Sequence, residues 1–251
     1  MEQNAVTACV LIIGNEILSG RTQDVNLNHI AQTLGEWGIQ VREARVIPDV
    51  TSTIIETVND ARSRYDYVFT TGGIGPTHDD ITADCIAEAF DVDLVLHPEI
   101  AARIEQRPAP PDVMASRLRM ARVPEGATLV DNPTGGPQGF RMENVFVMAG
   151  IPAVMQAMLS SLEGRLERGP VVHSHSVTAY LGESQIAGAL RDIQSRFPDV
   201  DLGSYPFFRA DRYGTSLVLR GTDEARLAAM MTEVKAAIVD AGETPQDVRT
   251  Q

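Results

Sequence analysis

The 251-residue sequence predicts an α/β protein: a three-layer α/β/α sandwich around a mostly parallel sheet, followed by a small C-terminal α/β domain. In the first half, short apolar runs alternate with amphipathic runs, which is the pattern of parallel strands joined by right-handed helical crossovers. Glycine-rich and acidic segments follow several of the apolar runs, where an open α/β sheet binds its ligands. A break at residues 167–170 separates the two predicted domains, 1–168 and 169–251.

The individual elements follow from the spacing of apolar residues. Residues 7–13 form a continuous apolar run and predict the first strand, while helical spacing over 26–37 predicts the first helix, which Gly38 ends. By the same criteria the first domain has further strands at 40–47, 67–71, 91–97, 127–130 and 145–148, and helices at 51–65, 81–90, 98–106, 112–122 and 151–166. The second domain has strands at 171–180, 200–205 and 216–220, helices at 184–197 and 224–241, and a frayed polar tail at 242–251.

The composition narrows the class of protein. The formal net charge is −13, from 34 acidic and 21 basic residues, which argues against binding to nucleic acid or to an anionic membrane. No apolar window approaches the length of a membrane-spanning helix, and the first residues lack the basic start and apolar core of a signal peptide. Cys9 and Cys85 lie among apolar residues, so we expect buried free thiols and a cytoplasmic protein.

The most informative segment is TTGGIGPTHDDIT, residues 70–82, at a predicted strand-to-helix turn. Glycines there permit positive φ angles and a close ligand approach, and the helix start attracts phosphate. Asp79 and Asp80 would repel a bare phosphate, so we expect a divalent cation between them and the ligand. The alternative is a glycine turn followed by an aspartate that caps the helix. The segment lacks the lysine of a P-loop and the third glycine of a dinucleotide fingerprint.

Other loops are expected at the same edge of the sheet. Residues 13–16 and 48–49 also follow predicted strands, and the carboxyl ends of parallel strands meet at one edge. A second glycine-rich loop spans residues 134–140. Backbone amides of Gly135, Gly136 and Gly139 would cradle a pyrophosphate there, and the alternative is a simple glycine-rich connection between strands.

Three segments together carry a resemblance to a known family: IGNEILSGRTQDVN at 13–26, TTGGIGPTHDDIT at 70–82 and NPTGGPQGF at 132–140. They resemble the molybdopterin-binding MoaB/Mog family. Within it they are most similar to the N-terminal part of competence/damage-inducible protein A (CinA) and to the molybdopterin-binding-like domain of FAD synthase. The segment AGIP at 149–152 departs from the family's usual Pro-Gly-x-Pro, and no glutamate follows it. The resemblance therefore implies no catalytic carboxylate at that helix start.

The resemblance implies catalytic roles for Asp49 and Asp80 and a metal held by Asp80, Asp79 and Asp49. Ordinary structural roles are the alternatives: a helix cap for Asp80 and a Pro-Asp turn for Asp49. Glu16 would contact the ligand or the metal, and Asp24 would contact the ligand or cap the following helix. The complete set of expected ligand-binding residues is Gly14, Asn15, Glu16, Asp24, Gly72, Gly73, Gly75, Thr77, Thr82, Gly135, Gly136 and Gly139.

The function implied first is that of a metal-dependent nucleotide pyrophosphatase. It would use Mg²⁺, Mn²⁺ or Co²⁺ to hydrolyse a nucleoside-diphosphate-linked small molecule of the ADP-ribose or FAD class. One alternative is a protein of molybdenum cofactor biosynthesis that binds molybdopterin and adenylylates it. Another is a non-catalytic module that binds a nucleotide or a pterin. In each case the partner is a small molecule, and members of the family are often homo-oligomers, either dimers or trimers.

Overall fold

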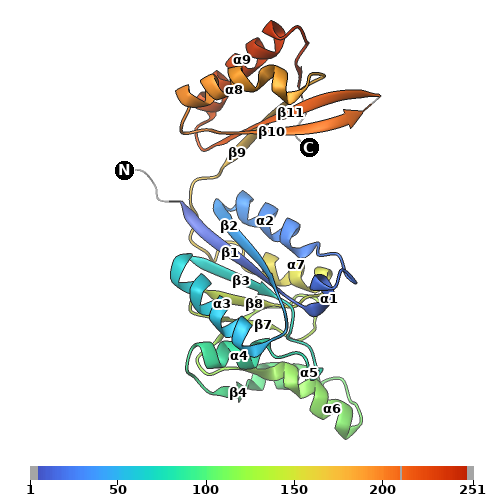
Figure 1. Ribbon diagram of the computed structural model, residues 1–251. Coiled ribbons are helices and arrows are strands. Elements are labelled where there is room, and N and C mark those ends of the chain that lie inside the picture. Colours follow the sequence, from blue (N-terminus) through green and yellow to red (C-terminus); the bar gives the residue numbers. More distant parts are fainter. Residues whose placement is uncertain (1–4, 210, 248–251) are drawn as a thin grey trace. The chain divides into compact units, whose positions relative to one another are not determined.

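The structure is a computed structural model that describes residues 5–209 and 211–247. The chain forms two compact units that divide between Gly169 and Pro170, and Figure 1 shows the elements of both. In the described residues, no helix is long and apolar enough to cross a membrane. The two units are described separately below.

The first unit is built on a six-stranded sheet with the strand order β2-β1-β3-β8-β7-β6. Four neighbouring strands, β2, β1, β3 and β8, run parallel, whereas β7 is antiparallel to both β8 and β6. The sheet is therefore mostly parallel, as predicted. The bounds are Val6–Ile13 for β1, Ile39–Ile47 for β2, Tyr67–Thr71 for β3, Thr128–Val130 for β6, Gly139–Met142 for β7 and Val145–Met148 for β8.

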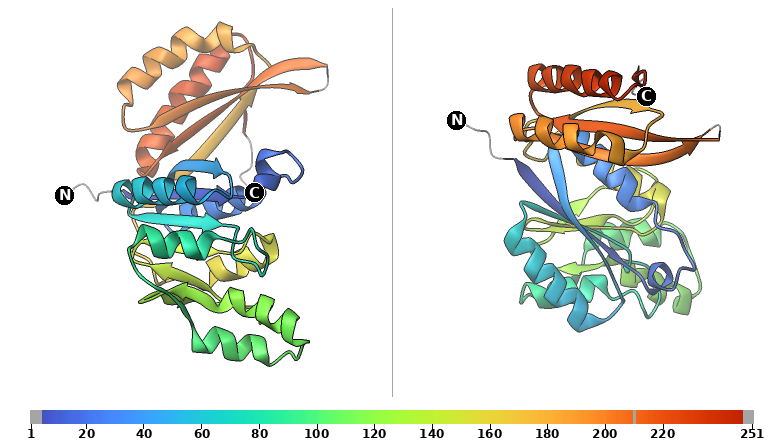
Figure 2. Two further views of the ribbon diagram at one scale, coloured as in Figure 1. Left: turned by 60° about the horizontal axis from the view of Figure 1, so that its bottom comes forward. Right: turned by 45° about the horizontal axis from the view of Figure 1, so that its top comes forward.

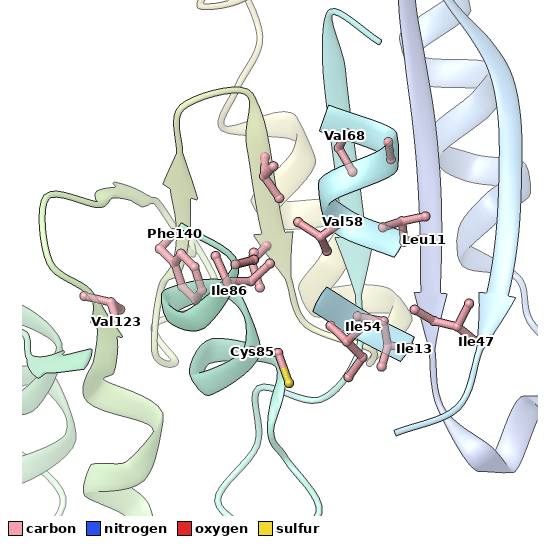
Figure 3. Packing of buried hydrophobic residues seen from close by; sticks show 14 of the residues in the cluster. Leu11, Ile13, Ile47, Ile54, Val58, Val68, Cys85, Ile86, Val123 and Phe140 are labelled. Carbon is pink, nitrogen blue, oxygen red and sulfur yellow. The ribbon is translucent and has the colours of Figure 1, made fainter. Parts of the chain in front are cut away.

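Helices cover both faces of this sheet, because alternate residues of its central strands point to opposite sides. Leu11 and Val68 lie in one buried cluster with side chains of α3 and α4, which Figure 3 shows from close by. Val10 and Phe69 lie in a second cluster with side chains of α2 and α7. The three-layer α/β/α sandwich is confirmed. These four helices span Asn26–Glu36 (α2), Thr51–Arg64 (α3), Thr82–Ala89 (α4) and Pro152–Ser160 (α7).

Several shorter elements differ from the prediction. The predicted helix 112–122 is divided into α6, a 3-10 turn and the strand β5, because Val123 is buried and β5 pairs with β4. Strand β7 lies in a region predicted as loop, and helix α1 was not predicted either. The bounds are Asn15–Leu18 for α1, Leu94–Leu96 for β4, Pro98–Glu105 for α5, Pro111–Leu118 for α6, Arg119–Ala121 for the 3-10 turn and Arg122–Pro124 for β5.

The second unit has an antiparallel sheet with the order β10-β11-β9-β12. Helices α8 and α9 lie on one face of it, as Figure 2 shows, and enclose their own core with residues such as Val177, Leu219 and Val234. The tail predicted as frayed contributes β12, while residues 248–251 lie outside the described part. The bounds are His173–Ala179 for β9, Glu183–Arg196 for α8, Asp201–Arg209 for β10, Arg212–Gly221 for β11, Glu224–Asp240 for α9 and Gln246–Asp247 for β12.

Candidate functional site

The strand register brings the predicted loops to one edge of the first sheet. Ile13 of β1 pairs with Ile47 of β2, so the segments that follow these two strands begin side by side. Thr71 of β3 pairs with the last residue of β8, and the first residue of β7 lies at the same edge because β7 runs antiparallel to β8. Both glycine-rich loops and the acidic segments therefore occupy the carboxyl edge of the parallel strands.

Asp49 joins the first two of these loops. Its carboxylate accepts a hydrogen bond from the backbone N–H of Asn15 at 2.9 Å, and Gly14 donates to the carbonyl of Ile47 at 3.1 Å. Burial raises the pKa of Asp49, and the negative charges of Glu16 and Asp79 raise it further. Acids from the ends of three strands thus share one electrostatic environment, in which a cation would be favourable.

Gly72 and Gly73 are required by the shape of the first glycine loop. Their φ angles are 103° and 67°, and a Cβ at either position would come closer than 3.0 Å to a neighbouring oxygen. At Gly72 that oxygen is the carbonyl of Ile13, and at Gly73 it is the hydroxyl of Thr82. Thr82 is fully buried and donates to the carbonyl of Gly72 at 3.0 Å. Thr82 therefore holds the loop in place and has no surface left for a ligand.

Asp80 closes the turn that precedes α4. Its carboxylate accepts from the backbone N–H of Thr77 at 2.8 Å and also from the Thr77 hydroxyl. The residue at the N-cap position of α4 is Ile81, and no side chain caps this helix. The capping role considered for Asp80 is therefore absent. Asp79 has an exposed side chain, 3.9 Å from the even more exposed His78.

Asp24 and Asn26 hold the start of α2 against the same edge. Asp24 accepts from the backbone N–H groups of Asn26 and Leu27, at 3.2 and 3.0 Å, so its carboxylate serves as the helix cap. The Asn26 side-chain amide donates to the carbonyl of Gly150 at 2.8 Å, next to Gly72. The Asn26 Oδ1 atom is buried and has no hydrogen-bond partner among the described residues.

The second glycine loop is organised by Asn132 and differs from the predicted amide cradle. The buried Asn132 side chain donates to the carbonyl of Pro137 at 2.8 Å and accepts from the backbone N–H of Thr134 at 3.1 Å. The N–H of Gly135 already donates to the Asn132 carbonyl at 3.0 Å. Gly139 lies in β7, where a Cβ would collide with the neighbouring strand. Gly135 and Gly139 therefore determine the shape of the loop. Of the three glycines expected to bind a pyrophosphate through their backbone amides, only Gly136 is not given another role by these contacts.

A narrow pocket lies between the two glycine loops. It has a solvent-accessible volume of about 20 Å³, room for a water molecule or two. It is lined by the backbone of the first glycine loop and by polar side chains: Gly73, Gly75, Asp80, Asp84, Arg119, Arg122 and Gln138. Arg119 Nε and Gln138 Oε1 are buried without a hydrogen-bond partner in the part of the chain that the structure describes. They supply one unused donor and one unused acceptor beside the first glycine loop.

Arg119 and Gln138 are the residues of this site that sequence reasoning missed. Arg119 falls inside a segment predicted to be an ordinary helix. Gln138 lies in the second glycine loop, directly before β7. Neither position carries a local pattern that would mark it. Gln138 comes near the first loop because β8, the hairpin partner of β7, pairs with β3, and Arg119 lies in the 3-10 turn that leads into β5.

A cation at this edge would have to complete its coordination with groups other than protein side chains. Across residues 5–209 and 211–247, no group of three or more His, Cys, Asp or Glu side chains is placed to hold a metal ion. Magnesium commonly binds through one or two carboxylates and completes its shell with water and substrate phosphates. Asp49 and Asp80 are the carboxylates of this edge that would be available for such a role, and the charge of Asp79 acts on Asp49.

Family profiles match both units of the chain. Residues 9–168 match the profile described as "Probable molybdopterin binding domain", and residues 171–246 match the one described as "FAD synthase, middle domain". A crystal structure of the protein CinA from Thermoplasma acidophilum is 32% identical, with a TM-score of 0.58. The match covers 64% of this chain and 98% of that chain.

Curated relatives include proteins of similar length and longer proteins. A protein of Archaeoglobus fulgidus is 36% identical over 78% of this chain and 84% of its own length. A CinA-like protein of Salinibacter ruber is 32% identical over 92% of this chain. A protein named probable FAD synthase, from Caenorhabditis briggsae, is 28% identical over 93% of this chain. This chain spans 58% and 50% of the lengths of the last two proteins.

Proposed function

Because this chain belongs to the molybdopterin-binding domain family and its CinA-like branch, we propose that it binds a phosphorylated small molecule at the carboxyl edge of the first sheet. The reaction proposed is the metal-dependent hydrolysis of a phosphoanhydride in a nucleoside-diphosphate-linked compound of the ADP-ribose or FAD class. The FAD synthase resemblance of both units favours a ligand of this class.

The observation that carries the proposal is the meeting of acids and glycines from separate strand ends. Asp49 follows β2, Asp80 follows β3, and the Gly72-Gly73 turn lies between β1 and β8. A divalent cation bound there would polarise the phosphoryl oxygens and lower the pKa of a bound water. Asp49 and Asp80 would hold this cation, since both carboxylates lie at the same edge and each keeps one oxygen free of the contacts described above.

The chain's own polar groups would position the phosphates. The first loop exposes backbone at Gly73 and Gly75, which line the narrow pocket together with Asp80. Arg119 Nε–H lines the same pocket and has no partner among the described residues, so it can donate to a phosphoryl oxygen as negative charge develops. The side-chain amide nitrogen of Gln138 donates to Glu99 at 2.8 Å. This bond fixes the side chain and leaves Gln138 Oε1 available as a hydrogen-bond acceptor.

The proposal is tested by measuring AMP or phosphate release from ADP-ribose, FAD, NAD and CoA with Mg²⁺, Mn²⁺ or Co²⁺. We expect turnover that requires metal and falls by at least about a hundredfold in Asp80→Asn and in Asp49→Asn, since each removes a ligand charge. Asp192→Asn, at an exposed position of α8 in the second unit, is the matched control and should keep full activity. Metal-independent turnover, or full activity in Asp80→Asn, would reject the assignment.

The alternative is molybdopterin binding with adenylylation, which the description of the family profile favours. The same carboxylates and glycine loop would then hold magnesium and the phosphates of ATP. Tight binding of molybdopterin, together with its conversion to an adenylylated product by ATP, would select this function. Ligand binding without turnover, and unchanged by Asp80→Asn, would instead identify a non-catalytic module.

A further inference from the structure

A second, larger pocket beside the Gly135-Gly136 turn is strongly basic. Three arginines line it: Arg103 from α5, Arg107 from the segment after α5, and Arg117 from α6. Its other lining residues are Ile104, Met120, Gly135, Gly136 and Pro137. The solvent-accessible volume is about 180 Å³, which is far more than the narrow pocket offers. None of the described residues that line it is acidic.

The positive charge of this pocket is poorly balanced by the protein itself. Arg103 donates to the carbonyls of Gly136 and Asn132, at 3.2 and 3.4 Å, and its nearest carboxylate is Asp131 at 3.8 Å. In the described part of the chain, Arg117 donates only to the carbonyl of Arg107, at 3.1 Å. Within the described residues, neither Arg107 nor Arg117 forms an ion pair. Such a cluster is unusual in a chain of net charge −13 and attracts an anion.

The two pockets are neighbours in the same site. Met120 lines both of them, and the second glycine loop contributes Gln138 to the narrow pocket and Gly136 to the basic one. A ligand whose pyrophosphate lies at the first glycine loop could therefore extend past Met120 into the basic pocket. The apolar surfaces of Ile104 and Pro137 would contact the part that joins its two anionic groups.

We propose that the basic pocket binds a phosphate monoester carried by the substrate, in addition to the pyrophosphate held at the first glycine loop. This proposal rests on the proposed function for the position of the pyrophosphate. Three guanidinium groups suit a phosphate monoester better than a carboxylate, because the monoester offers three terminal oxygens and nearly two negative charges. The preferred substrate class is thus a dinucleotide or nucleotide conjugate that carries a phosphate monoester in addition to its pyrophosphate.

Matched pairs of compounds that differ by one phosphate monoester test this assignment. Binding of CoA and dephospho-CoA, and of NADP and NAD, is measured by calorimetry with Mg²⁺ on the full chain. We expect the wild type to bind the phosphorylated member of at least one pair roughly tenfold more tightly or better, in keeping with a charge-assisted hydrogen bond. Arg107→Gln should remove most of this preference, because its guanidinium has no other described hydrogen bond.

Two further variants make the result interpretable. Arg117→Gln should also reduce the preference, although it removes the bond to the Arg107 carbonyl and therefore needs a check of thermal stability. Arg42→Gln, at an exposed position of β2 on the opposite edge strand of the sheet, is the matched control and should retain the preference. Equal affinities within both pairs for the wild type, an absence of binding by either phosphorylated compound, or a preference that survives Arg107→Gln would each overturn the proposal.

The turnover assay separates this inference from the proposed function. Metal-dependent hydrolysis without any preference for the phosphorylated compounds would reject the basic pocket and retain the pyrophosphatase. A preference that depends on Arg107, without hydrolysis of any compound, would retain the pocket and reject the pyrophosphatase.

Discussion

Replacing Gly72 by alanine tests how tightly the ends of β1 and β3 approach at the candidate site. Gly72 has a φ angle of 103°, and its new Cβ would lie closer than 3.0 Å to the carbonyl oxygen of Ile13. Left-handed backbone costs an L-residue about 1–2 kcal/mol. Collision with a packed neighbour adds about 1–3 kcal/mol, because a backbone oxygen at the end of a buried strand cannot swing aside. We therefore expect Gly72→Ala to lower the free energy of unfolding by about 2–5 kcal/mol.

Gly126→Ala is the matched control for this experiment. Gly126 has a similarly positive φ of 84°, but apart from its chain neighbours no atom of the described residues lies within 4 Å of the position where its Cβ would be. It should therefore show the backbone cost alone, about 1–2 kcal/mol. Urea unfolding followed by circular dichroism and by the fluorescence of Trp37, which is buried in the first unit, measures both variants. Equal losses for the two variants would refute the close approach that we infer between β1 and β3.

Further predictions concern the second loop, the thiols and the C-terminal core. Asn132→Ala removes the bonds to Thr134 and Pro137, and it should cost about 2 kcal/mol and raise the KM of the turnover assay. Burial raises the pKa of Cys9 and of Cys85 from 9.0 to about 11, so neither thiol should react with a thiol reagent in the native protein at pH 8. Because the folded-state pKa is the higher one, the stability from these thiols is complete below pH 9.0 and is lost as the pH rises through about 11. Leu219→Ala should destabilise the second unit by about 2–5 kcal/mol, seen as an earlier transition in circular dichroism while Trp37 fluorescence keeps its midpoint.

The outcomes that would contradict these predictions are equally specific. An unchanged KM and stability for Asn132→Ala would mean that the loop does not depend on its side chain. Rapid labelling of the native thiols at pH 8, compared with the urea-unfolded chain as a control, would contradict their burial. A shift of the Trp37 transition in Leu219→Ala would show that the two cores do not unfold independently.

Much of the fold was predictable because its central strands are buried on both faces. Six consecutive residues from Ala8 to Ile13 are buried, which gives the continuous apolar run expected of an interior parallel strand. Strand β7 was not predictable in the same way. It contains Arg141 and begins at a glycine, so its pairing with the apolar β8 defines it rather than its own residue pattern.

The candidate site shows the same division between local and long-range information. The acids at strand ends were predictable from sequence, since a strand end is visible as the end of an apolar run. The hydrogen-bond partners were not: Thr82 was expected to contact a ligand, but it is buried beneath the first loop. Arg119 and Gln138 line one pocket with Asp80 although both are far from it in the sequence, and for Gln138 the reason is that β8, the hairpin partner of β7, pairs with β3.

The burial of β1 has a consequence for the timescales on which the site moves. Strand β1 pairs with β2 on one side and with β3 on the other, so its amide hydrogens exchange with solvent only when the sheet opens. Within a few residues the chain reaches the exposed Asn15 and the segment that follows it. Slow and fast amide exchange would therefore meet close to Ile13, so that the segment proposed to contact the ligand is attached directly to a strand whose amides exchange slowly.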